Sequence, residues 1–213
     1  MQRTLLFWAM SLAILAGGTW FVCPQGECAA TAFDRVGLGF AHALRGELLD
    51  GWMPGITWIG SLAVLLPITS TVSLVLVYSR RRREAGFLML ALLGAAVLGH
   101  LAKLMVVRPR PDLFPVWTAL PADWSYPSAH AMQITAAALA LALVCARRRA
   151  LWAVPLGMVV LLVGLSRLYL QVHFPSDVLA GTLAAAFWAA GLHAWMFGRL
   201  AEHERMNING VRA

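Results

Sequence analysis

Six long apolar stretches, almost free of charged residues, limit what this chain can fold into more than any other feature. They cover residues 4–22, 56–78, 85–107, 128–146, 150–168 and 176–197. Each has about the 20 apolar residues that a helix needs to cross a bilayer. Because 60% of the 213 residues are hydrophobic and only 13% are charged, a soluble globule, a disordered chain and a disulfide-rich secreted domain are excluded. We therefore expect a single all-α domain, 1–213, folded as a polytopic membrane bundle of six transmembrane helices.

The positive charges indicate how this bundle is oriented. With the N-terminus inside, the cytoplasmic segments hold eleven cations and the outer segments six. The inner set is Arg3, Arg80–Arg83, Arg147–Arg149, Arg199, Arg205 and Arg212. Cytoplasmic loops carry an excess of Lys and Arg, so the asymmetry predicts both termini in the cytoplasm. Despite a net charge of +7, nucleic acid is not an expected partner, because the arginines lie between apolar stretches and not on a water-soluble face.

The N-terminal part of the chain carries three further predictions. The stretch 4–22 is expected to be a span; the alternative is a cleaved signal peptide, whose apolar core is usually shorter. Cys23 and Cys28 flank a short outer loop, where they either form a disulfide in an oxidising periplasm or remain two free thiols. Phe33, Val36 and Phe40 recur at helical spacing, which predicts a short interfacial helix on the bilayer, either a lip for lipid entry or a simple cover.

Ionisable residues near a span cost roughly 2.5–3.5 kcal/mol on insertion scales, and three clusters of them fall at the predicted outer face. The first ends the third stretch: Lys103, the only lysine, is followed seven residues later by Arg110-Pro111. Seven residues are about two helical turns, so Lys103 and Arg110 would share one side of a continued helix. Pro109 and Pro111 would turn Arg110 over the end of the bundle. Together an ammonium and a guanidinium suit a tetrahedral oxyanion; the alternative is a pair of snorkelling anchors.

The second cluster, Ser125-Tyr126-Pro127-Ser128-Ala129-His130, opens the fourth stretch. We expect Ser125 to be the helix N-cap and Pro127 to lie in the first turn. Backbone N–H groups at such a start bind anions such as phosphate, and the Ser128 hydroxyl adds a donor. His130 lies one turn further in, at the same mouth. Taken alone, a histidine at a helix start is more often a structural polar residue than a catalyst.

The third cluster joins the last two stretches and reads Ser166-Arg167, five residues, His173, three residues, Asp177. Pro175 would begin the last helix and place Asp177 in its first turn, where the helix dipole favours a carboxylate. Asp177 follows His173 by four positions and can accept a hydrogen bond from one ring nitrogen. This contact would fix the tautomer and leave the other nitrogen free to attack. A histidine with an orienting carboxylate indicates catalysis more specifically than either residue alone.

In this order and with these spacings, the three clusters resemble the type 2 phosphatidic acid phosphatase (PAP2) family. The family pattern is Lys-x6-Arg-Pro, then Pro-Ser-Gly-His, then Ser-Arg-x5-His-x3-Asp. The first and third motifs are complete in this chain, whereas the second has Ala129 in place of glycine. Alanine still supplies its backbone N–H at a helix start, where φ is negative. The resemblance covers 103–177 by motif and is specific for the family but not for the substrate.

The resemblance implies a mechanism without metal or other cofactor, in which three fixed cations take the role of Mg²⁺. His173 would attack phosphorus and form a phosphohistidine, Asp177 would orient its ring, and His130 would protonate the leaving oxygen and then activate water. The residues that would hold the phosphoryl group are Lys103, Arg110, Pro111, Ser128, Ala129, Ser166 and Arg167. The implied location is a bacterial inner membrane, with the active site facing the periplasm.

Residues around the motifs receive less specific interpretations. Arg108, Asp112 and Asp123 would only solvate the loop between the first two clusters, and Trp117 and Trp124 fit an interfacial aromatic belt as well as a substrate lid. His100 would support Lys103 or simply pack, and His193 is interpreted as structural.

The preferred function is that of a lipid phosphatase at the outer leaflet, whose partners are the bilayer and a phospholipid or polyprenyl phosphate. Undecaprenyl diphosphate is the preferred substrate, because the small size and short loops resemble bacterial undecaprenyl diphosphate phosphatases. Phosphatidylglycerophosphate, phosphatidate and lipid A phosphates are the alternative lipids. A lipid phosphotransferase on the same scaffold, a non-enzymatic membrane protein and a phosphatase of soluble esters are the alternatives in class. The motifs do not distinguish water from a lipid acceptor, and they say nothing of the oligomeric state.

Overall fold

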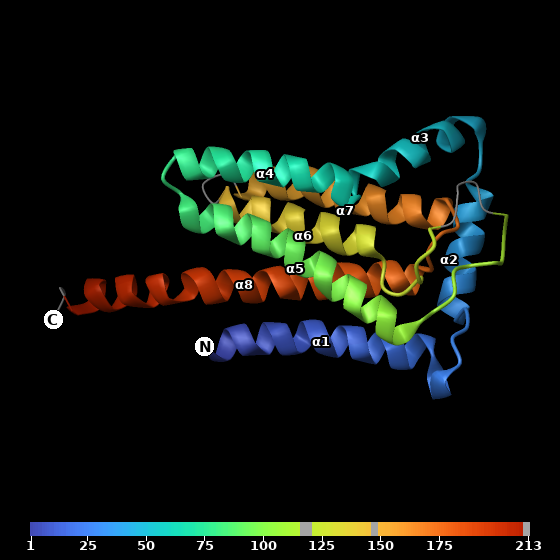
Figure 1. Cartoon of the computed structure of the whole chain (residues 1–213), viewed down its shortest axis with the longest axis horizontal. Coiled ribbons are helices and arrows are strands. Elements are labelled where there is room, and N and C mark those ends of the chain that lie inside the picture. The colour runs from blue at the N-terminus through green and yellow to red at the C-terminus, as the bar shows by residue number, and fades with distance from the viewer. Residues whose placement is uncertain (116–120, 146–148, 211–213) are drawn as a thin grey trace.

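The computed structural model describes residues 1–115, 121–145 and 149–210, and every regular element in these ranges is helical (Figure 1). The elements are α1 (Gln2–Val22), the 3₁₀ turn η1 (Pro24–Gly26), α2 (Ala32–Ala43), α3 (Glu47–Ile59), α4 (Leu62–Tyr78), α5 (Arg82–Val106), α6 (Ala129–Val144), α7 (Arg149–Tyr169) and α8 (Pro175–Gly210). The expected all-α class is confirmed. Four residues with a predicted place, Trp117, Arg147, Arg148 and Arg212, lie outside the described residues.

The long helices lie side by side as one bundle, and α2 crosses one of its ends (Figure 1). Four helical segments in the described part are each long and apolar enough to cross a membrane: α1, α5, Leu151–Tyr169 of α7 and Pro175–Gly198 of α8. The pair α3–α4 reaches the same apolar length only with a bend of 49°, and α6 is a shorter apolar helix of 16 residues. The structure therefore supports four or five spans, and the count of six remains a prediction.

The prediction of one continuous span over 56–78 is wrong, because the chain breaks between α3 and α4. Gly60 ends α3, and Ser61 caps α4 by accepting a hydrogen bond from the Val64 N–H at 3.3 Å. The turn lies tightly against α6 and α7: a Cβ added at Gly60 would lie 2.5 Å from Val163 Cγ1 and 3.2 Å from His130 Cβ. Glycine at this position therefore lets the bend approach the helix that begins with His130.

α6 occupies the middle of the bundle and contacts α4, α5, α7 and α8. Its small side chains, among them the buried Ala136 and Ala140, let these helices approach closely. Close packing also joins the starts of α6 and α8. Ser128 N–H donates to the Asp177 carbonyl at 3.1 Å, and a Cβ on Gly181 would lie 2.9 Å from the Ser128 carbonyl oxygen. The second and third sequence clusters are thereby held against each other by backbone contacts.

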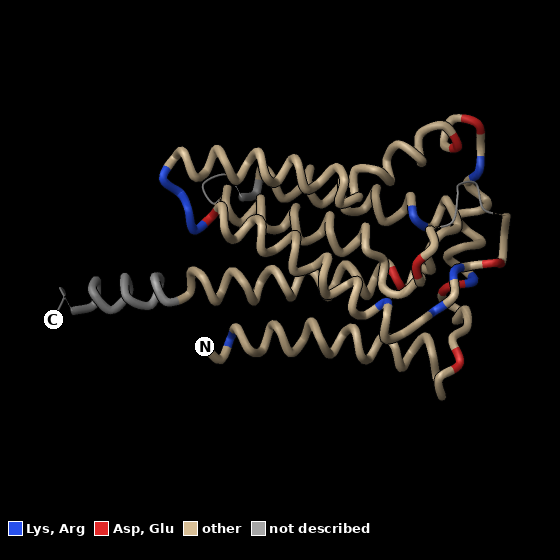
Figure 2. The backbone as a smooth tube through the Cα atoms, in the orientation of Figure 1, with Lys and Arg blue, Asp and Glu red and all other residues tan. Residues whose placement is uncertain are grey.

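Charged residues gather at the two ends of the bundle and are nearly absent between them (Figure 2). Arg80–Arg83 lie in the connection from α4 to α5 and in the first turn of α5, at the same end of the bundle as the N-terminus and the end of α8 (Figures 1 and 2). α2 lies at the opposite end and exposes Phe33, Val36 and Phe40, which are 52%, 74% and 66% exposed. An amphipathic helix with its apolar face outward supports the expected interfacial position of α2.

Candidate active site

The three sequence clusters meet at the end of the bundle that α2 crosses. α5 and α7 end there, and α6 and α8 begin there (Figure 1). Helix α5 stops at Val107, whose φ of 54° is left-handed, and Pro109 prevents its continuation. The motif residues of four different helices and of two connecting segments are thus brought to one place.

His173 lies in the turn between α7 and α8 and is 1% exposed. Its Nδ1 lies 3.5 Å from Asp177 Oδ2, and its Nε2 lies 3.4 Å from Arg110 Nη1. Burial lowers the pKa of His173 well below its usual value, and the positive charges of Arg167 and Lys103 lower it further. The imidazole is therefore neutral and keeps a lone pair for attack on an electrophile.

Asp177 is fully buried and is held by donors from the surrounding loops. Ser125 Oγ donates to its Oδ2 at 2.5 Å, and the Phe174 N–H donates to the same oxygen at 2.9 Å. The prediction that Ser125 caps the following helix is therefore wrong. Ser128 is the N-cap of α6 and accepts from the Ala131 N–H at 3.5 Å, since the helix begins three residues later than expected. Ser125 instead supplies a buried carboxylate with the hydrogen bond it requires.

Lys103 and Arg110 converge as the spacing predicted, and Asp123 bridges them. Lys103 Nζ lies 3.2 Å from Asp123 Oδ2, and Arg110 Nη2 lies 2.5 Å from Asp123 Oδ1. Partial burial would raise the pKa of Asp123, but the two cations outweigh it and lower the pKa below its usual value. The sequence suggested that Asp123 only solvates a loop, but in the structure it binds both cations. Because the Asp123 carboxylate binds both cations at once, the pair is spaced to hold an oxyanion.

Arg167 is the third cation and is 4% exposed near the end of α7. Its Nη1 donates to Thr57 Oγ1 of α3 at 2.6 Å. Its Nε is buried and has no hydrogen-bond partner among the described residues. Thr57 could not be predicted from the sequence, because a lone threonine within an apolar stretch gives no signal of a partner on another helix. The unpaired Nε–H makes Arg167 a donor that a phosphoryl oxygen could satisfy.

The remaining predicted residues occupy different positions. Ser128 and Ala129 start α6, where backbone N–H groups lack intrahelical acceptors, and the half-buried His130 follows them. His130 is near enough to His173 for its charge to contribute to the lowered pKa of His173. Pro111, which follows Arg110 in the chain, is buried. The Ser166 hydroxyl donates to the Val163 carbonyl at 2.7 Å within α7, so its role in substrate binding remains a prediction.

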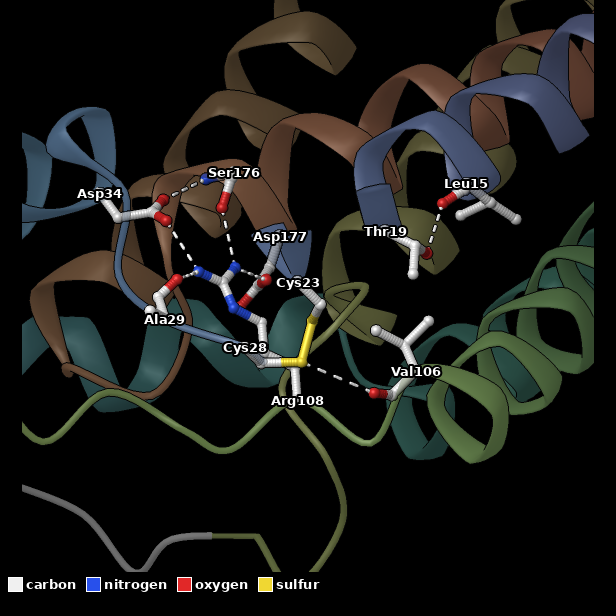
Figure 3. The surroundings of a disulfide bond; sticks show 10 residues. All are labelled: Leu15, Thr19, Cys23, Cys28, Ala29, Asp34, Val106, Arg108, Ser176 and Asp177. Carbon is white, nitrogen blue, oxygen red and sulfur yellow. Dashed lines mark hydrogen bonds and ion pairs between the residues drawn. A yellow bond between two sulfur atoms is a disulfide. The ribbon is translucent and has the colours of Figure 1, made fainter. Parts of the chain in front are cut away.

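A buried ion network beside Asp177 escaped sequence analysis (Figure 3). Arg108, which was expected only to solvate a loop, is fully buried and pairs with two buried carboxylates, Asp34 of α2 and Asp177 of α8. The one available signal was Thr31-x-x-Asp34, the pattern of a capping box at the start of α2. Both reciprocal bonds of that box are present, each at 3.1 Å. No pattern in the sequence, however, pairs residue 34 with residue 108.

Cys23 and Cys28 form a disulfide that closes the turn η1 between α1 and α2 (Figure 3). Of the two alternatives that the sequence left open, the structure shows the bridge. The residue after it, Ala29, accepts a hydrogen bond from Arg108 Nη2 through its carbonyl at 2.9 Å. Cys145 is a free thiol near the end of α6. The bridge therefore anchors the segment that leads from the first helix to the buried arginine.

The all-helical bundle with apolar spans, and the three cations, two histidines and buried carboxylate gathered at one of its ends, point to the class of membrane lipid phosphatases, from which the relatives below come. Within that class the chain belongs to the PAP2 superfamily, whose family model matches residues 84–201. The predicted family is thereby confirmed.

Named relatives and a solved structure agree with this membership. The undecaprenyl-diphosphatase of Sulfolobus acidocaldarius is 34% identical over 144 residues, which are 65% of this chain and 66% of that protein, just under two thirds. Phosphatidylglycerophosphatase B of Bacillus subtilis is 32% identical over 149 residues, 66% of this chain and 72% of that protein. The crystal structure of a PAP2 type phosphatidylglycerolphosphate phosphatase from Bacillus subtilis has a TM-score of 0.75 at 22% identity and covers 92% of this chain and 96% of its own. At that identity the last comparison shows the fold alone.

Proposed function

We propose that this protein hydrolyses a phosphomonoester or diphosphate of a membrane lipid at the outer leaflet, through a phosphohistidine intermediate. The observation that carries the proposal is the placement of His173, whose ring has Asp177 at Nδ1 and Arg110 at Nε2. A neutral, buried imidazole beside fixed cations suits attack on a phosphoryl group. The imidazole supplies the lone pair, and the cations balance the negative charge of the phosphoryl oxygens.

In the first step, Nε2 of His173 forms a bond to phosphorus while the bond from phosphorus to the leaving oxygen breaks. His130 takes up a proton as the anionic phosphoryl group binds beside it, and it gives this proton to the leaving oxygen. The imidazole becomes positively charged as the N–P bond forms, and Asp177 at Nδ1 stabilises this charge. Lys103 and Arg110 hold the phosphoryl oxygens in the place that the Asp123 carboxylate takes in the structure.

In the second step, His130 accepts a proton from water as the water oxygen bonds to phosphorus and the N–P bond breaks. Inorganic phosphate leaves, and both histidines return to their starting states. Backbone N–H groups at the start of α6 and the unpaired Nε of Arg167 supply further donors to the phosphoryl oxygens. We propose that these groups suffice without a metal ion or other cofactor, so that a chelator leaves turnover unchanged.

We also propose that the chain crosses a bacterial inner membrane six times, with both termini in the cytoplasm and the site facing the periplasm. Besides the four segments that qualify alone, the bent pair α3–α4 and the short α6 are the fifth and sixth crossings. Arg80–Arg83 lie at the end of the bundle opposite the site, as expected for cytoplasmic charges (Figures 1 and 2). The disulfide of η1 lies at the site end, which agrees with an oxidising periplasm.

Undecaprenyl diphosphate is the substrate we propose first. The relative named undecaprenyl-diphosphatase supports a polyprenyl diphosphate, whereas phosphatidylglycerophosphatase B supports a glycerophospholipid. The exposed apolar face of α2 beside the site suits any substrate that remains in the leaflet during the reaction. Phosphatidylglycerophosphate, phosphatidate and lipid A phosphates are therefore the competing substrates in the test.

The test is phosphate release by the purified protein in detergent, with a chelator present, from each of these four lipids. We expect release from at least one lipid and a loss of at least about 100-fold in His173→Ala, because the nucleophile is gone. His100→Ala is the matched control, since His100 is an exposed histidine on α5 and its removal should leave release unchanged. Brief reaction with ³²P-labelled lipid, stopped with alkali, would detect the phosphohistidine directly, as label on the protein that is stable in alkali and released by acid.

Three results would contradict the proposal. No release from any lipid by folded protein would exclude the hydrolase. Phosphate that appears on a second lipid, instead of as inorganic phosphate, would identify a phosphotransferase. Full activity of His173→Ala would exclude His173 as the nucleophile.

A further inference from the structure

Arg108 directs all of its terminal N–H groups to the protein itself (Figure 3). Its Nη1 donates to Asp177 Oδ1 at 2.5 Å and to Ser176 Oγ at 2.8 Å. Its Nη2 donates to Asp34 Oδ2 at 2.8 Å and to the Ala29 carbonyl at 2.9 Å. The guanidinium also lies over the Phe174 ring, 3.9 Å from its centroid. Arg110 is also bound to the protein, but the Asp123 carboxylate on it is 48% exposed, whereas both carboxylates on Arg108 are fully buried. Arg108 therefore does not present its terminal nitrogens to a phosphate.

The two oxygens of Asp177 have separate tasks. Oδ1 is bound by Arg108, whereas Oδ2 accepts from Ser125 and lies 3.5 Å from His173 Nδ1. A carboxylate bound at both oxygens cannot rotate about its side-chain torsion without breaking one set of contacts. Arg108 therefore fixes the direction in which Asp177 presents Oδ2 to the imidazole.

Asp34 extends the same arrangement to the helix that crosses the end of the bundle. Its Oδ2 binds Arg108, and its Oδ1 accepts from the Ser176 N–H at 3.0 Å, one residue before Asp177. Asp34 is itself held by the capping box at the start of α2. Two carboxylates share one guanidinium, so the network has one negative charge in excess. This charge lies beside the ring that becomes positive when a bond forms at its Nε2.

We propose that Arg108 is a positioning residue of the active site, which holds Asp177 between α8 and Asp34 of α2 and thereby orients His173 for attack. The inference rests on the proposed function, because it requires His173 to be the nucleophile. It also makes α2 and the segment after the disulfide part of the catalytic assembly.

A merely structural arginine predicts a different outcome on mutation. Loss of a structural residue lowers the amount of folded protein but leaves each folded molecule with normal turnover. Loss of a positioning residue lowers kcat in folded molecules and leaves KM nearly unchanged, because Arg108 does not touch the substrate. Slower formation of the phosphoenzyme in a single turnover would identify the attack by His173 as the affected step.

The experiment uses the double variant Arg108→Gln with Asp34→Asn, which removes the arginine without leaving Asp34 as an unpaired buried charge. With the best lipid substrate, and normalised to folded, monodisperse protein, we expect kcat to fall about 100-fold, the effect of a displacement of about 1 Å in a reacting group. KM should stay within about twofold, a change too small for the loss of a direct contact to substrate. Arg108→Lys should restore only part of kcat, since one ammonium cannot bind both carboxylates as a guanidinium does.

Arg35→Gln is the matched control, because Arg35 is an exposed arginine of α2 whose hydrogen bonds within the described part of the chain go to the Ala30 carbonyl. It should retain the kcat of the wild type. A double variant with normal kcat, or one with raised KM and normal kcat, would overturn the positioning role while the proposed function stands. A wild type that releases no phosphate, or a fully active His173→Ala, would overturn the proposed function and this inference with it.

Discussion

Asp123 places a carboxylate of the protein on the two cations that we propose bind phosphate. Its oxygens lie 3.2 Å from Lys103 Nζ and 2.5 Å from Arg110 Nη2, and its side chain is 48% exposed. An incoming phosphate must displace this carboxylate or share the cations with it, and two anions at one site repel each other. If the two cations bind phosphate as we propose, Asp123 lowers the affinity of the site for it.

This competition gives a prediction for Asp123→Asn. The amide keeps the shape of the side chain but removes its charge, so substrate no longer competes with an anion. We expect KM, and the inhibition constant of inorganic phosphate, to fall about two- to fivefold, the range that a partly exposed ion pair of up to about 1 kcal/mol allows. Steady-state kinetics with phosphate as inhibitor measure both constants. A weaker binding of phosphate would show instead that Asp123 is needed to hold the cations.

The charge state of His173 gives a prediction for pH. Protonation of its imidazole removes the nucleophile, so activity falls as pH decreases through the pKa of His173. Because burial and then the neighbouring cations lower that pKa, the acidic fall must lie below about pH 6.5, the value of a free imidazole. A profile of kcat/KM from about pH 4.5 to about pH 8 would test this. A midpoint at or above the free value would contradict the neutral, buried imidazole.

At the scale of single residues, the sequence predicted those pairs of site residues that belong to one short motif. His173 and Asp177 are four positions apart, and Lys103 and Arg110 are seven apart, so local geometry brings each pair together. The partners of Arg108 and Arg167 could not be predicted, because Asp34 and Thr57 come from other helices far along the chain. A buried arginine and an exposed one also have the same appearance in a sequence.

The break between α3 and α4 gives a prediction at the level of elements. Gly60→Ala adds a Cβ that would lie 2.5 Å from Val163 Cγ1, so α3 must move away from α7. We expect a loss of about 1–3 kcal/mol in stability, as for overpacking, together with lower activity, because Thr57 of α3 holds Arg167. Thermal unfolding in detergent and phosphate release measure the two effects.

Gly55→Ala on the same helix is the control, because a Cβ there meets nothing within 4 Å. It should leave stability unchanged or raise it by up to about 1 kcal/mol. Equal effects of the two substitutions would show that the close approach at Gly60 is not what sets the bend.

Helices were predictable where apolar length and end signals coincide, as in α1, α5 and α8. The bend at Gly60 was not, because a broken apolar helix has the same composition as a continuous one and its two local signals, Gly60 and Ser61, are common within spans. Tertiary packing against Val163 and His130 determines that the chain bends at this point.

For the whole molecule, the proposed orientation can be tested by labelling with a membrane-impermeant maleimide. In a Cys145→Ser background, Leu48→Cys lies at the start of α3 near the site, and Arg82→Cys lies at the start of α5 at the opposite end. We expect Leu48→Cys to react in intact spheroplasts and Arg82→Cys to react only after permeabilisation, because the excess of arginine marks the cytoplasmic end. The reverse pattern would place the site on the cytoplasmic face.

The shortness of α6 has a consequence for where in the membrane the reaction takes place. Its 16 residues extend about 24 Å, whereas the hydrocarbon layer is about 30 Å thick. A central helix of this length cannot bring its ends to both edges of that layer, so we expect the histidine at its first turn to lie below the level of the lipid headgroups. A lipid then meets this histidine, His130, and the neighbouring His173 at the depth of its own uppermost acyl carbons, by moving sideways from the bilayer, and only the released phosphate has to pass upward into water.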